Sequence, residues 1–286
     1  MLWSFSTRLK SINAHPMPEL PEVEVSRRGL VPYLNGKQVR AAVVRTPKLR
    51  HPIPEELPQR LAGRTLRTIE RRGKYLVFDF ADSWLILHLG MSGSLRLVVP
   101  GTPPQKHDHF DLEFSDTVMR FRDPRRFGTL IWTDTNPNAH PLLAVLGIEP
   151  LSSAFDGNWL HEAIKGRSAP IKPVLMDSHL LVGVGNIYAS ESLYRAGISP
   201  LRAAGRIAHA RCNTLATAIR ETLEASIAAG GSSVRDYVHS DGGAGCFHLT
   251  CAVYDREGHP CPACGTLVRS LRQAGRSTYW CPRCQR

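Results

Sequence analysis

Four cysteines close to the C-terminal end limit what the last part of this chain can fold into. They form two Cys-x2-Cys pairs separated by 16 residues: Cys261, Cys264, Cys281 and Cys284. This spacing is typical of a structural zinc site, in which four thiolates fill a tetrahedral shell and leave no open position for a substrate. The alternative is a coincidental set of free thiols. We expect one zinc ion, which stabilises a small module and does no chemistry.

A basic and aromatic segment, residues 271–280, lies between the two cysteine pairs. Two strands joined by a turn here would present Arg276 outward, where its guanidinium group is a suitable phosphate ligand. An ordinary solvated arginine is the alternative. The segment therefore predicts a β-hairpin zinc finger with one candidate contact to an anion.

The apolar pattern divides the rest of the chain in two. One helix is expected over 21–34, and helices are expected again after about residue 150. Between them lie short, alternating segments bounded by turns, which are typical of strands: 39–45, 65–70, 75–80, 84–89, 94–99, 109–114, 118–122 and 128–133. The later helices are expected over 159–165, 172–177, 186–196 and 209–229. We predict an α+β protein with an N-terminal β-sandwich, a leading helix, and a C-terminal helical domain that carries the zinc module.

The charge of the chain indicates an anionic partner. Lysine and arginine together number 36 against 25 acidic residues, which gives a formal net charge of +11 and an isoelectric point near 9.6. Nucleic acid is the simplest such partner. No apolar run approaches the roughly 20 residues that a membrane span needs. The three cysteines outside the pairs, Cys212, Cys246 and Cys251, favour a reducing compartment over a disulfide framework.

The segment Met-Pro-Glu-Leu-Pro-Glu-Val-Glu at residues 17–24 combines a methionine, a proline and a carboxylate. If synthesis starts at Met17 and this residue is removed, the Pro18 nitrogen becomes a free secondary amine. Such an amine can attack a carbon at the aldehyde oxidation level and form a cationic iminium. Glu19 and Glu22 follow within one helical turn and could carry protons. The alternative interpretation is a helix start with proline in the first turn.

Residues 1–16 bear directly on this chemistry. They are basic and contain no acidic residue, which allows either a short organellar transit peptide or a start codon assigned too early. We favour the early start. With these residues attached, the Pro18 nitrogen is part of a tertiary amide and is not a nucleophile.

A glycine-rich run precedes the helix expected over 186–196. Gly183-Val-Gly185-Asn186 offers exposed N–H groups and an asparagine at the helix start, which together suit a phosphate group. A phosphate-binding P-loop is excluded because no Gly-Lys-Ser/Thr follows. Taken alone, Asn186 suits a helix cap; within this run we favour contact with DNA.

Three further segments carry candidate binding residues. Lys74 ends the run Arg71-Arg72-Gly73-Lys74, which is either a solvated charge cluster or a phosphate contact. The loops 90–94 and 123–128 carry Met91 and, two residues apart, Arg125 and Phe127. An enzyme that flips a base out of a duplex needs apolar wedges and an arginine to fill the vacancy. Burial of Met91 and Phe127 in a core is the alternative.

In order and spacing, these motifs resemble the formamidopyrimidine-DNA glycosylase family over residues 17–286. The resemblance implies a helix–two-turn–helix domain and a bifunctional DNA glycosylase and abasic-site lyase, which removes oxidised purines (8-oxoguanine, formamidopyrimidines) from double-stranded DNA. It also implies that Pro18 forms a Schiff base with the sugar, that Glu19 moves protons there, and that β,δ-elimination follows. Lys74 and Arg276 would bind phosphates around this site.

The resemblance assigns further roles. Met91 and Phe127 match the residues that fill the void left by the everted base, and Arg125 matches the reader of the widowed cytosine. The loop that runs from Gly230 to Gly245 matches the one that covers the everted base. The remaining matches are DNA contacts: His107, Arg167 and Asn186.

The expected domains are 18–148 (catalytic β-sandwich), 149–245 (helix–two-turn–helix) and 246–286 (zinc finger), with 1–17 absent from the mature enzyme. We expect a monomer that acts in the bacterial cytoplasm, on the nucleoid. Two alternatives remain. Endonuclease VIII-like enzymes prefer oxidised pyrimidines, but usually carry Gly-Pro where this chain has Leu20-Pro21. A zinc-containing DNA-binding protein without activity is the second, if residues 1–17 are retained.

Overall fold

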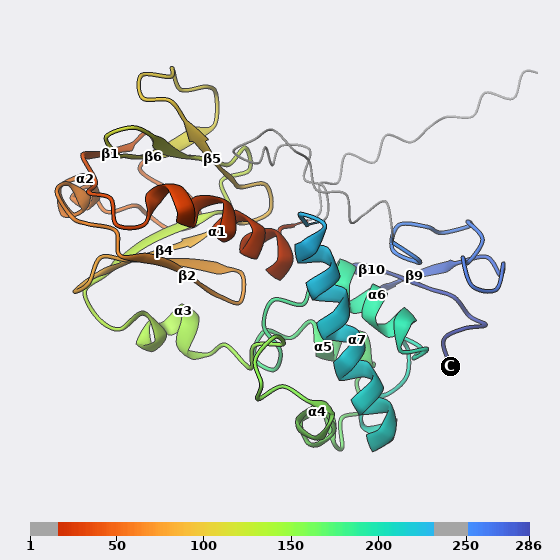
Figure 1. Ribbon diagram of the computed structural model, residues 1–286. Coiled ribbons are helices and arrows are strands. Elements are labelled where there is room, and N and C mark those ends of the chain that lie inside the picture. Colours follow the sequence, from red (N-terminus) through yellow and green to blue (C-terminus); the bar gives the residue numbers. More distant parts are fainter. Residues whose placement is uncertain (1–16, 232–250) are drawn as a thin grey trace, which may run out of the picture.

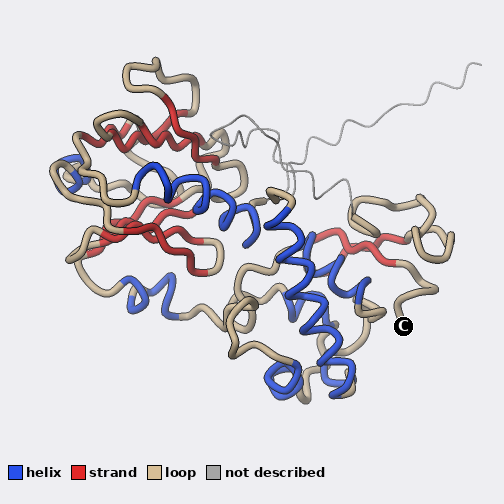
Figure 2. The backbone as a smooth tube through the Cα atoms, in the orientation of Figure 1, coloured by secondary structure: helices blue, strands red, loops and turns tan. Residues whose placement is uncertain are grey.

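The computed structural model describes residues 17–231 and 251–286, and its N-terminal half is a sandwich of two antiparallel sheets (Figures 1 and 2). One sheet has the strand order β1-β6-β7-β5 and the other the order β2-β3-β4-β8. The side chains of alternate residues point into the space between the sheets, where one apolar core forms. The strands are β1 Ala41–Val44, β2 Thr68–Arg72, β3 Tyr75–Asp79, β4 Trp84–His88, β5 Ser94–Val98, β6 Asp108–Glu113, β7 Val118–Arg122 and β8 Thr129–Thr133.

Helix α1 (Leu20–Leu34) belongs to both halves of the molecule. Val23 and Leu30 pack into the core of the sandwich, whereas Leu20 and Val25 pack into a second core formed by the C-terminal helices. Figure 1 shows the N-terminal end of α1 beside α7, and the helix then runs along the sandwich. The first residues of the described chain therefore lie at the junction of the two halves.

The C-terminal half is helical. Its helices are α4 Gly157–Ile164, α5 Ile171–Leu175, α6 Asn186–Arg195 and α7 His209–Ala228. The predicted apolar stripe of α7 is buried, including Leu215, Ile219 and Leu223. Strands β9 (Arg269–Gln273) and β10 (Arg276–Trp280) form a separate antiparallel hairpin beside α6.

The structure confirms the predicted α+β architecture, the eight sandwich strands and the five predicted helices to within a few residues. Sequence analysis did not predict two short helices, α2 (Leu57–Leu61) and α3 (Pro141–Ala144), or two 3-10 turns, η1 (Pro137–Ala139) and η2 (Ala204–Arg206). Among the described residues, no helix is both long and apolar enough to cross a membrane.

Candidate active site

Glu19 connects the start of the chain to helix α6. Its buried carboxylate accepts hydrogen bonds from the backbone N–H groups of Gly185 (2.7 Å) and Ile187 (3.1 Å). These N–H groups lie at the N-terminus of α6, where they have no partner within the helix and where the helix dipole favours negative charge. Helix α1 is held in a matching way, because the Glu22 carboxylate accepts from the Glu19 N–H at 2.8 Å. The Glu19 carboxylate therefore joins the N-terminal end of α1 to the N-terminal end of α6.

The glycines of the predicted phosphate-binding run are needed for this contact. A Cβ atom on Gly185 would overlap the Glu19 carboxyl group, and one on Gly183 would lie 2.6 Å from the Cβ of Leu20. Gly183 also has a φ of +81°, a conformation that glycine adopts without strain. Its carbonyl accepts from the Leu20 N–H at 3.0 Å. These glycines therefore form a cradle for residues 19 and 20.

The environment of Glu19 raises its pKa into the neutral range. Burial raises the pKa of Glu19 to about 7, and the nearby Glu22 adds to this, whereas Lys74 and the N–H groups at the α6 terminus lower it. A carboxyl group with this pKa can both donate and accept a proton at working pH. Burial also disfavours the charged form of Lys74 and so lowers its pKa, whereas the nearby Glu19 carboxylate raises it.

Lys74 is placed by the turn between β2 and β3. The Glu149 carboxylate accepts from the Gly73 N–H at 2.6 Å and from the guanidinium groups of Arg71 (2.9 Å) and Arg72 (3.2 Å). Two of the three cations in the predicted charge run are therefore paired at the junction with the helical half. The part-buried Lys74 side chain instead lines a pocket.

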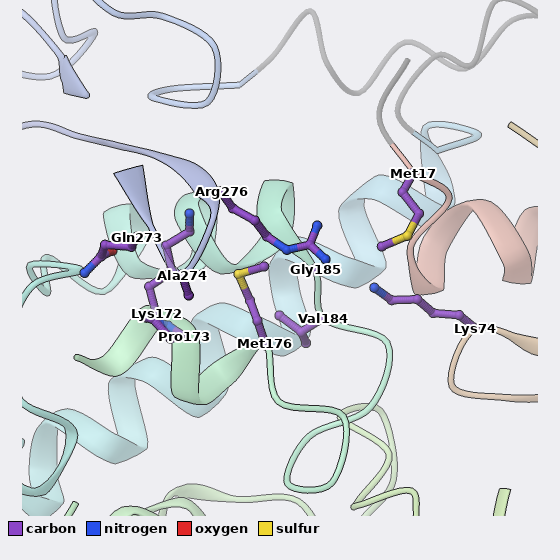
Figure 3. A pocket seen from close by; sticks show the side chains of 10 residues that line it. All are labelled: Met17, Lys74, Lys172, Pro173, Met176, Val184, Gly185, Gln273, Ala274 and Arg276. Atoms are coloured by element: carbon purple, nitrogen blue, oxygen red, sulfur yellow. The ribbon is translucent and has the colours of Figure 1, made fainter. Parts of the chain in front are cut away.

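This pocket has a volume of about 200 Å³ and is lined by residues from both halves of the molecule (Figure 3). Lys74 enters from the sandwich and the exposed Arg276 from the hairpin, and Met17 lies directly before Pro18 on the same rim. Two cationic side chains, Met17 with the Pro18 that follows it, and Glu19 thus lie within one region. The positive charges of Lys74 and Arg276 would suit a phosphate group. The full lining is Met17, Lys74, Lys172, Pro173, Met176, Val184, Gly185, Gln273, Ala274 and Arg276.

The hairpin presents Arg276 as the sequence predicted. The connection between β9 and β10 is a two-residue turn, Ala274-Gly275, with φ of 45° and 77°. Positive φ at both central residues is the geometry of a tight hairpin turn that matches the twist of the strands. Arg276 is the first residue after this turn, so its side chain extends from the tip toward the pocket.

Lys172 is a pocket residue that sequence analysis missed. It is 1% exposed, and its ammonium group donates to the Asn186 Oδ1 (2.6 Å), the Ser277 carbonyl (2.9 Å) and the Thr278 Oγ1 (2.8 Å). Burial lowers the pKa of Lys172 to about 8. This one side chain connects α5, α6 and β10. No short motif marks it, because a lysine within an apolar helix reads as an ordinary surface residue.

The helix-cap interpretation of Asn186 was wrong by one residue. Gly185 is the N-cap of α6, and Asn186 is the first helical residue. Because Glu19 already satisfies the N–H groups of this terminus, a side-chain cap from Asn186 is not needed. The Asn186 amide accepts from Lys172 instead, which fixes its orientation.

The two loops with candidate void-filling residues lie beside each other. The main chain of Gly90 packs directly against the Phe127–Gly128 peptide, since a Cβ atom there would overlap it. Phe127 is 44% exposed, and its ring lies 5.0 Å from the Arg125 guanidinium carbon. Burial in the core is therefore excluded for Phe127, whereas Met91 is partly buried. An exposed aromatic ring and an arginine at one loop tip suit insertion into a duplex.

The remaining predicted contacts lie outside the pocket. His107 directly precedes β6 and has a φ of 76°, unusual for a residue with a side chain. Arg167 follows α4, where its exposed guanidinium group donates to the Ala163 carbonyl at 3.0 Å. The structure does not bring Arg167 together with the pocket lining. The candidate base-covering loop falls largely on residues 232–250, outside the described part of the chain.

The four paired cysteines lie together. Their Sγ atoms are all within 4.8 Å of one another, with Cys261 and Cys284 at 3.8 Å and Cys264 and Cys281 at 3.5 Å. A tetrahedral zinc ion with Zn–S bonds of about 2.3 Å would require sulfur separations of about 3.8 Å. The thiol geometry therefore fits a four-thiolate metal site.

Comparisons with known proteins match each part of this architecture. The family model of the formamidopyrimidine-DNA glycosylase N-terminal domain matches residues 17–130, and that of the formamidopyrimidine-DNA glycosylase H2TH domain matches residues 146–238. The model of the zinc finger found in FPG and IleRS matches residues 258–286. The chain belongs to the formamidopyrimidine-DNA glycosylase family. The predicted resemblance is thereby confirmed.

Members of this family in other bacteria match almost the whole chain. The formamidopyrimidine-DNA glycosylase of Dechloromonas aromatica is 60% identical over 276 residues, and that of Thiobacillus denitrificans is 55% identical over 271. Both alignments cover 94% of this chain and 100% of the relative.

Solved structures of the family superpose on this chain. The complex between the Lactococcus lactis Fpg and DNA that contains an abasic site gives a TM-score of 0.85 at 34% identity, over 94% of this chain and 99% of that one. The MutM (Fpg) protein from Thermus thermophilus gives 0.83 at 40% identity, over 94% and 98%. The fold of this chain is therefore that of formamidopyrimidine-DNA glycosylases.

Proposed function

We infer that this chain is a bifunctional DNA glycosylase and abasic-site lyase of base-excision repair, which removes oxidised purines. One observation carries the inference: residues 17–19, the cradle at Gly185 and two cationic side chains, Lys74 and Arg276, converge at one pocket. The solved relatives include complexes with DNA that contains an abasic site or a formamidopyrimidine nucleotide. Damaged double-stranded DNA is accordingly the proposed substrate.

The proposed reaction begins at Pro18. Its free secondary amine attacks C1′ of the damaged nucleoside, the C1′–N bond to the base breaks, and the base leaves with a proton. Opening of the sugar ring gives a cationic Schiff base between Pro18 and C1′, and Glu19 supplies the proton that the ring oxygen takes up. Loss of a C2′ proton then expels the 3′ phosphate, and a second elimination expels the 5′ phosphate. Hydrolysis of the remaining adduct restores Pro18.

The other candidate residues would hold the DNA in place for this reaction. We assign Lys74, Arg276 and Asn186 to phosphates around the damaged nucleotide. Met91 and Phe127 would fill the void that the flipped base leaves, and Arg125 would contact the base opposite. The exposure of Phe127 and of both arginines supports these roles. His107 and Arg167 are proposed as further DNA contacts on the resemblance to the family.

Zinc is the proposed metal of the four-cysteine site. Four thiolates form a closed shell that suits a structural zinc ion. In this proposal the ion stabilises the module that presents Arg276, and it takes no part in the reaction.

The chemistry requires a free amine at Pro18, so we propose that residues 1–17 are absent from the active enzyme. The family model begins at residue 17, which supports this start. We further propose the domain limits 18–148, 149–245 and 246–286. A monomer is expected, and because the substrate is chromosomal DNA, the proposed location is the bacterial nucleoid.

A substrate panel tests the proposed specificity. Protein that begins at Pro18 is incubated with duplexes that contain 8-oxoguanine, a formamidopyrimidine or thymine glycol, each opposite its usual partner. Faster strand cleavage at the two oxidised purines supports the proposal. Faster cleavage at thymine glycol would instead place the chain with the enzymes that act on oxidised pyrimidines.

A further inference from the structure

Asp123, a residue without an assigned role so far, lies at the base of both loops that carry the proposed void-filling residues. It directly follows β7 as the first residue of the loop 123–128 and is fully buried, with an exposed fraction of 0%. A buried carboxylate is costly unless hydrogen bonds satisfy both of its oxygens. The hydrogen-bond partners of Asp123 therefore indicate its structural role.

Each oxygen of Asp123 accepts from a different loop. Oδ1 accepts from the Ser92 hydroxyl at 2.6 Å, and Ser92 is the neighbour of Met91. Oδ2 accepts from the Gly128 N–H at 2.7 Å, directly after Phe127. The Arg125 N–H lies 3.1 Å from the Ser92 Oγ and 3.3 Å from Oδ1, so it closes the arrangement.

The backbone of Asp123 extends the same connection to a third element. Its N–H donates to the His107 carbonyl at 3.0 Å, and its carbonyl lies 2.9 Å from the Nε2 of His109. His107 is a proposed DNA contact held at positive φ. One residue thus contacts the loops of Met91, of Arg125 and Phe127, and of His107.

The packing around Asp123 leaves the two loops little freedom to move independently. Gly90 packs against the Phe127–Gly128 peptide, and a Cβ on Gly128 would lie 2.6 Å from the Phe121 ring and 3.0 Å from Oδ2 of Asp123. The two loops therefore share a main-chain contact and a buried carboxylate. A shift of one loop requires the other to move with it.

We propose that Asp123 is a positioning residue that holds the Met91 loop and the Arg125–Phe127 loop as one rigid wedge for the widowed base. The proposal rests on the void-filling roles assigned above. Simultaneous insertion of an apolar tip and an arginine requires a fixed distance between the two loops, and the buried Asp123 carboxylate supplies it through its bonds to Ser92 and Gly128. Pre-organisation of this kind lowers the cost of binding.

Two substitutions test the proposal. Asp123→Asn keeps the shape but leaves only one accepting oxygen, so an NH2 group faces the N–H or hydroxyl group of one loop. Ser92→Ala removes the bond from the Met91 loop to Oδ1 and the acceptor of the Arg125 N–H, and it leaves the bond between Oδ2 and Gly128 in place. Asp111→Asn is the control, because Asp111 is a similarly buried carboxylate (1% exposed) in the same sheet, bonded to Arg45 and Arg120 and to neither loop. Thermal unfolding identifies variants that are merely destabilised.

Single-turnover excision is measured on duplexes with 8-oxoguanine opposite cytosine or adenine, and elimination is measured on a single-stranded abasic oligonucleotide, which has no base opposite. We expect D123N to slow excision opposite cytosine about tenfold or more and to weaken the preference for cytosine over adenine, as loss of a hydrogen bond to a buried charge would. S92A should show a smaller effect of the same kind. Elimination on the single strand should stay within about twofold of wild type for both.

Met91→Ala and Phe127→Ala distinguish a failure of the positioning role of Asp123 from a failure of the void-filling roles on which it rests. If both impair duplex excision while folded D123N and S92A retain wild-type rates and opposite-base preference, the positioning role is wrong and the void-filling roles stand. If M91A and F127A have no effect, the void-filling roles fail and the positioning role fails with them. Should D123N not fold, S92A decides. A loss of preference in D111N equal to that in D123N would also contradict the proposal.

Discussion

The Glu19 carboxyl group is subject to opposing influences. Burial disfavours its charge, whereas Lys74 and the N–H groups of the α6 terminus favour it, and the balance raises its pKa to about 7. An exposed glutamate would be almost fully ionised at neutral pH. The cradle around Gly185 therefore does more than bind an anion, because it holds this carboxyl group where both protonation states are accessible.

Glu19→Gln tests this role. The carboxyl group is protonated below a pH of about 7, so a step in which it donates a proton slows as the pH rises through that value. Wild-type excision of 8-oxoguanine should show this decline, and E19Q should lose it together with about 10²-fold or more of the rate. Rates from pH 5.5 to 8.5 under single-turnover conditions provide the measurement. A wild-type decline near pH 7 that persists in E19Q would show that another group titrates.

At this scale the sequence predicts residues that belong to motifs and misses residues defined only by burial. Pro18, Glu19 and the cysteines stand in recognisable spacing. Lys172 and Asp123 do not, although Asp123 begins a loop that we singled out. Their roles depend on partners that no motif marks and that include residues distant in sequence: Ser277 lies 105 residues from Lys172, and Ser92 lies 31 residues from Asp123.

Between elements, Lys172 is the connection that holds the hairpin to α6. Lys172→Met should remove three hydrogen bonds and lower the affinity for a duplex with a stable abasic-site analogue by about tenfold. In the wild type, the pKa of about 8 means that charge is lost as the pH rises through that value, and a neutral amine has only two N–H groups for three acceptors. Wild-type affinity should therefore fall above pH 8, toward that of K172M.

Lys165→Met is the matched control for this prediction. Lys165 is exposed after α4 and pairs with Glu162 at the surface, so its substitution should leave affinity and pH dependence unchanged. Titration by fluorescence anisotropy at several pH values distinguishes the two lysines. Equal behaviour of K172M and K165M would argue against the bridging role.

Removal of the metal should disorder the hairpin that carries Arg276. Strands β9 and β10 form an isolated pair beside a small core of Val253, Val268 and the cysteines, too few apolar groups to stabilise a fold alone. A chelator, or Cys261→Ser, should accelerate hydrogen exchange in residues 258–286 and abolish excision, while the sandwich strands keep their protection. Cys212→Ser, in α7, is the control. Normal excision by metal-free protein would contradict this account.

Elements were predicted well where apolar and polar residue types alternate in the sequence, as in β6, where Phe110 and Leu112 face the core. The missed helices α2 and α3 have five and four residues, too few for a helical period to show. Both begin at or beside a proline, a residue that is also common in turns. The N-cap of α6 was wrongly assigned to Asn186 because the carboxylate that accepts from the N–H groups at this helix start belongs to Glu19, which lies 166 residues from Gly185 in the sequence.

For the whole molecule, the junction of the two halves carries the proposed active site. Helix α1 contributes side chains to both apolar cores. This packing places residues 17–19, at its N-terminal end, between the sandwich and α6. Lys74, Glu149 and the cradle all lie at this same junction. Composition and motifs predicted two halves and a zinc finger, but the distance between the halves follows only from contacts across them.

Borohydride trapping tests the central claim most directly. Protein shown by mass to begin at Pro18 is reacted with a duplex that contains 8-oxoguanine opposite cytosine, reduced, digested and mapped. We predict DNA linked to the peptide that begins at Pro18, and no adduct from protein that retains residues 1–17. Linkage to a lysine, or no adduct from protein that begins at Pro18, would contradict the proposed mechanism.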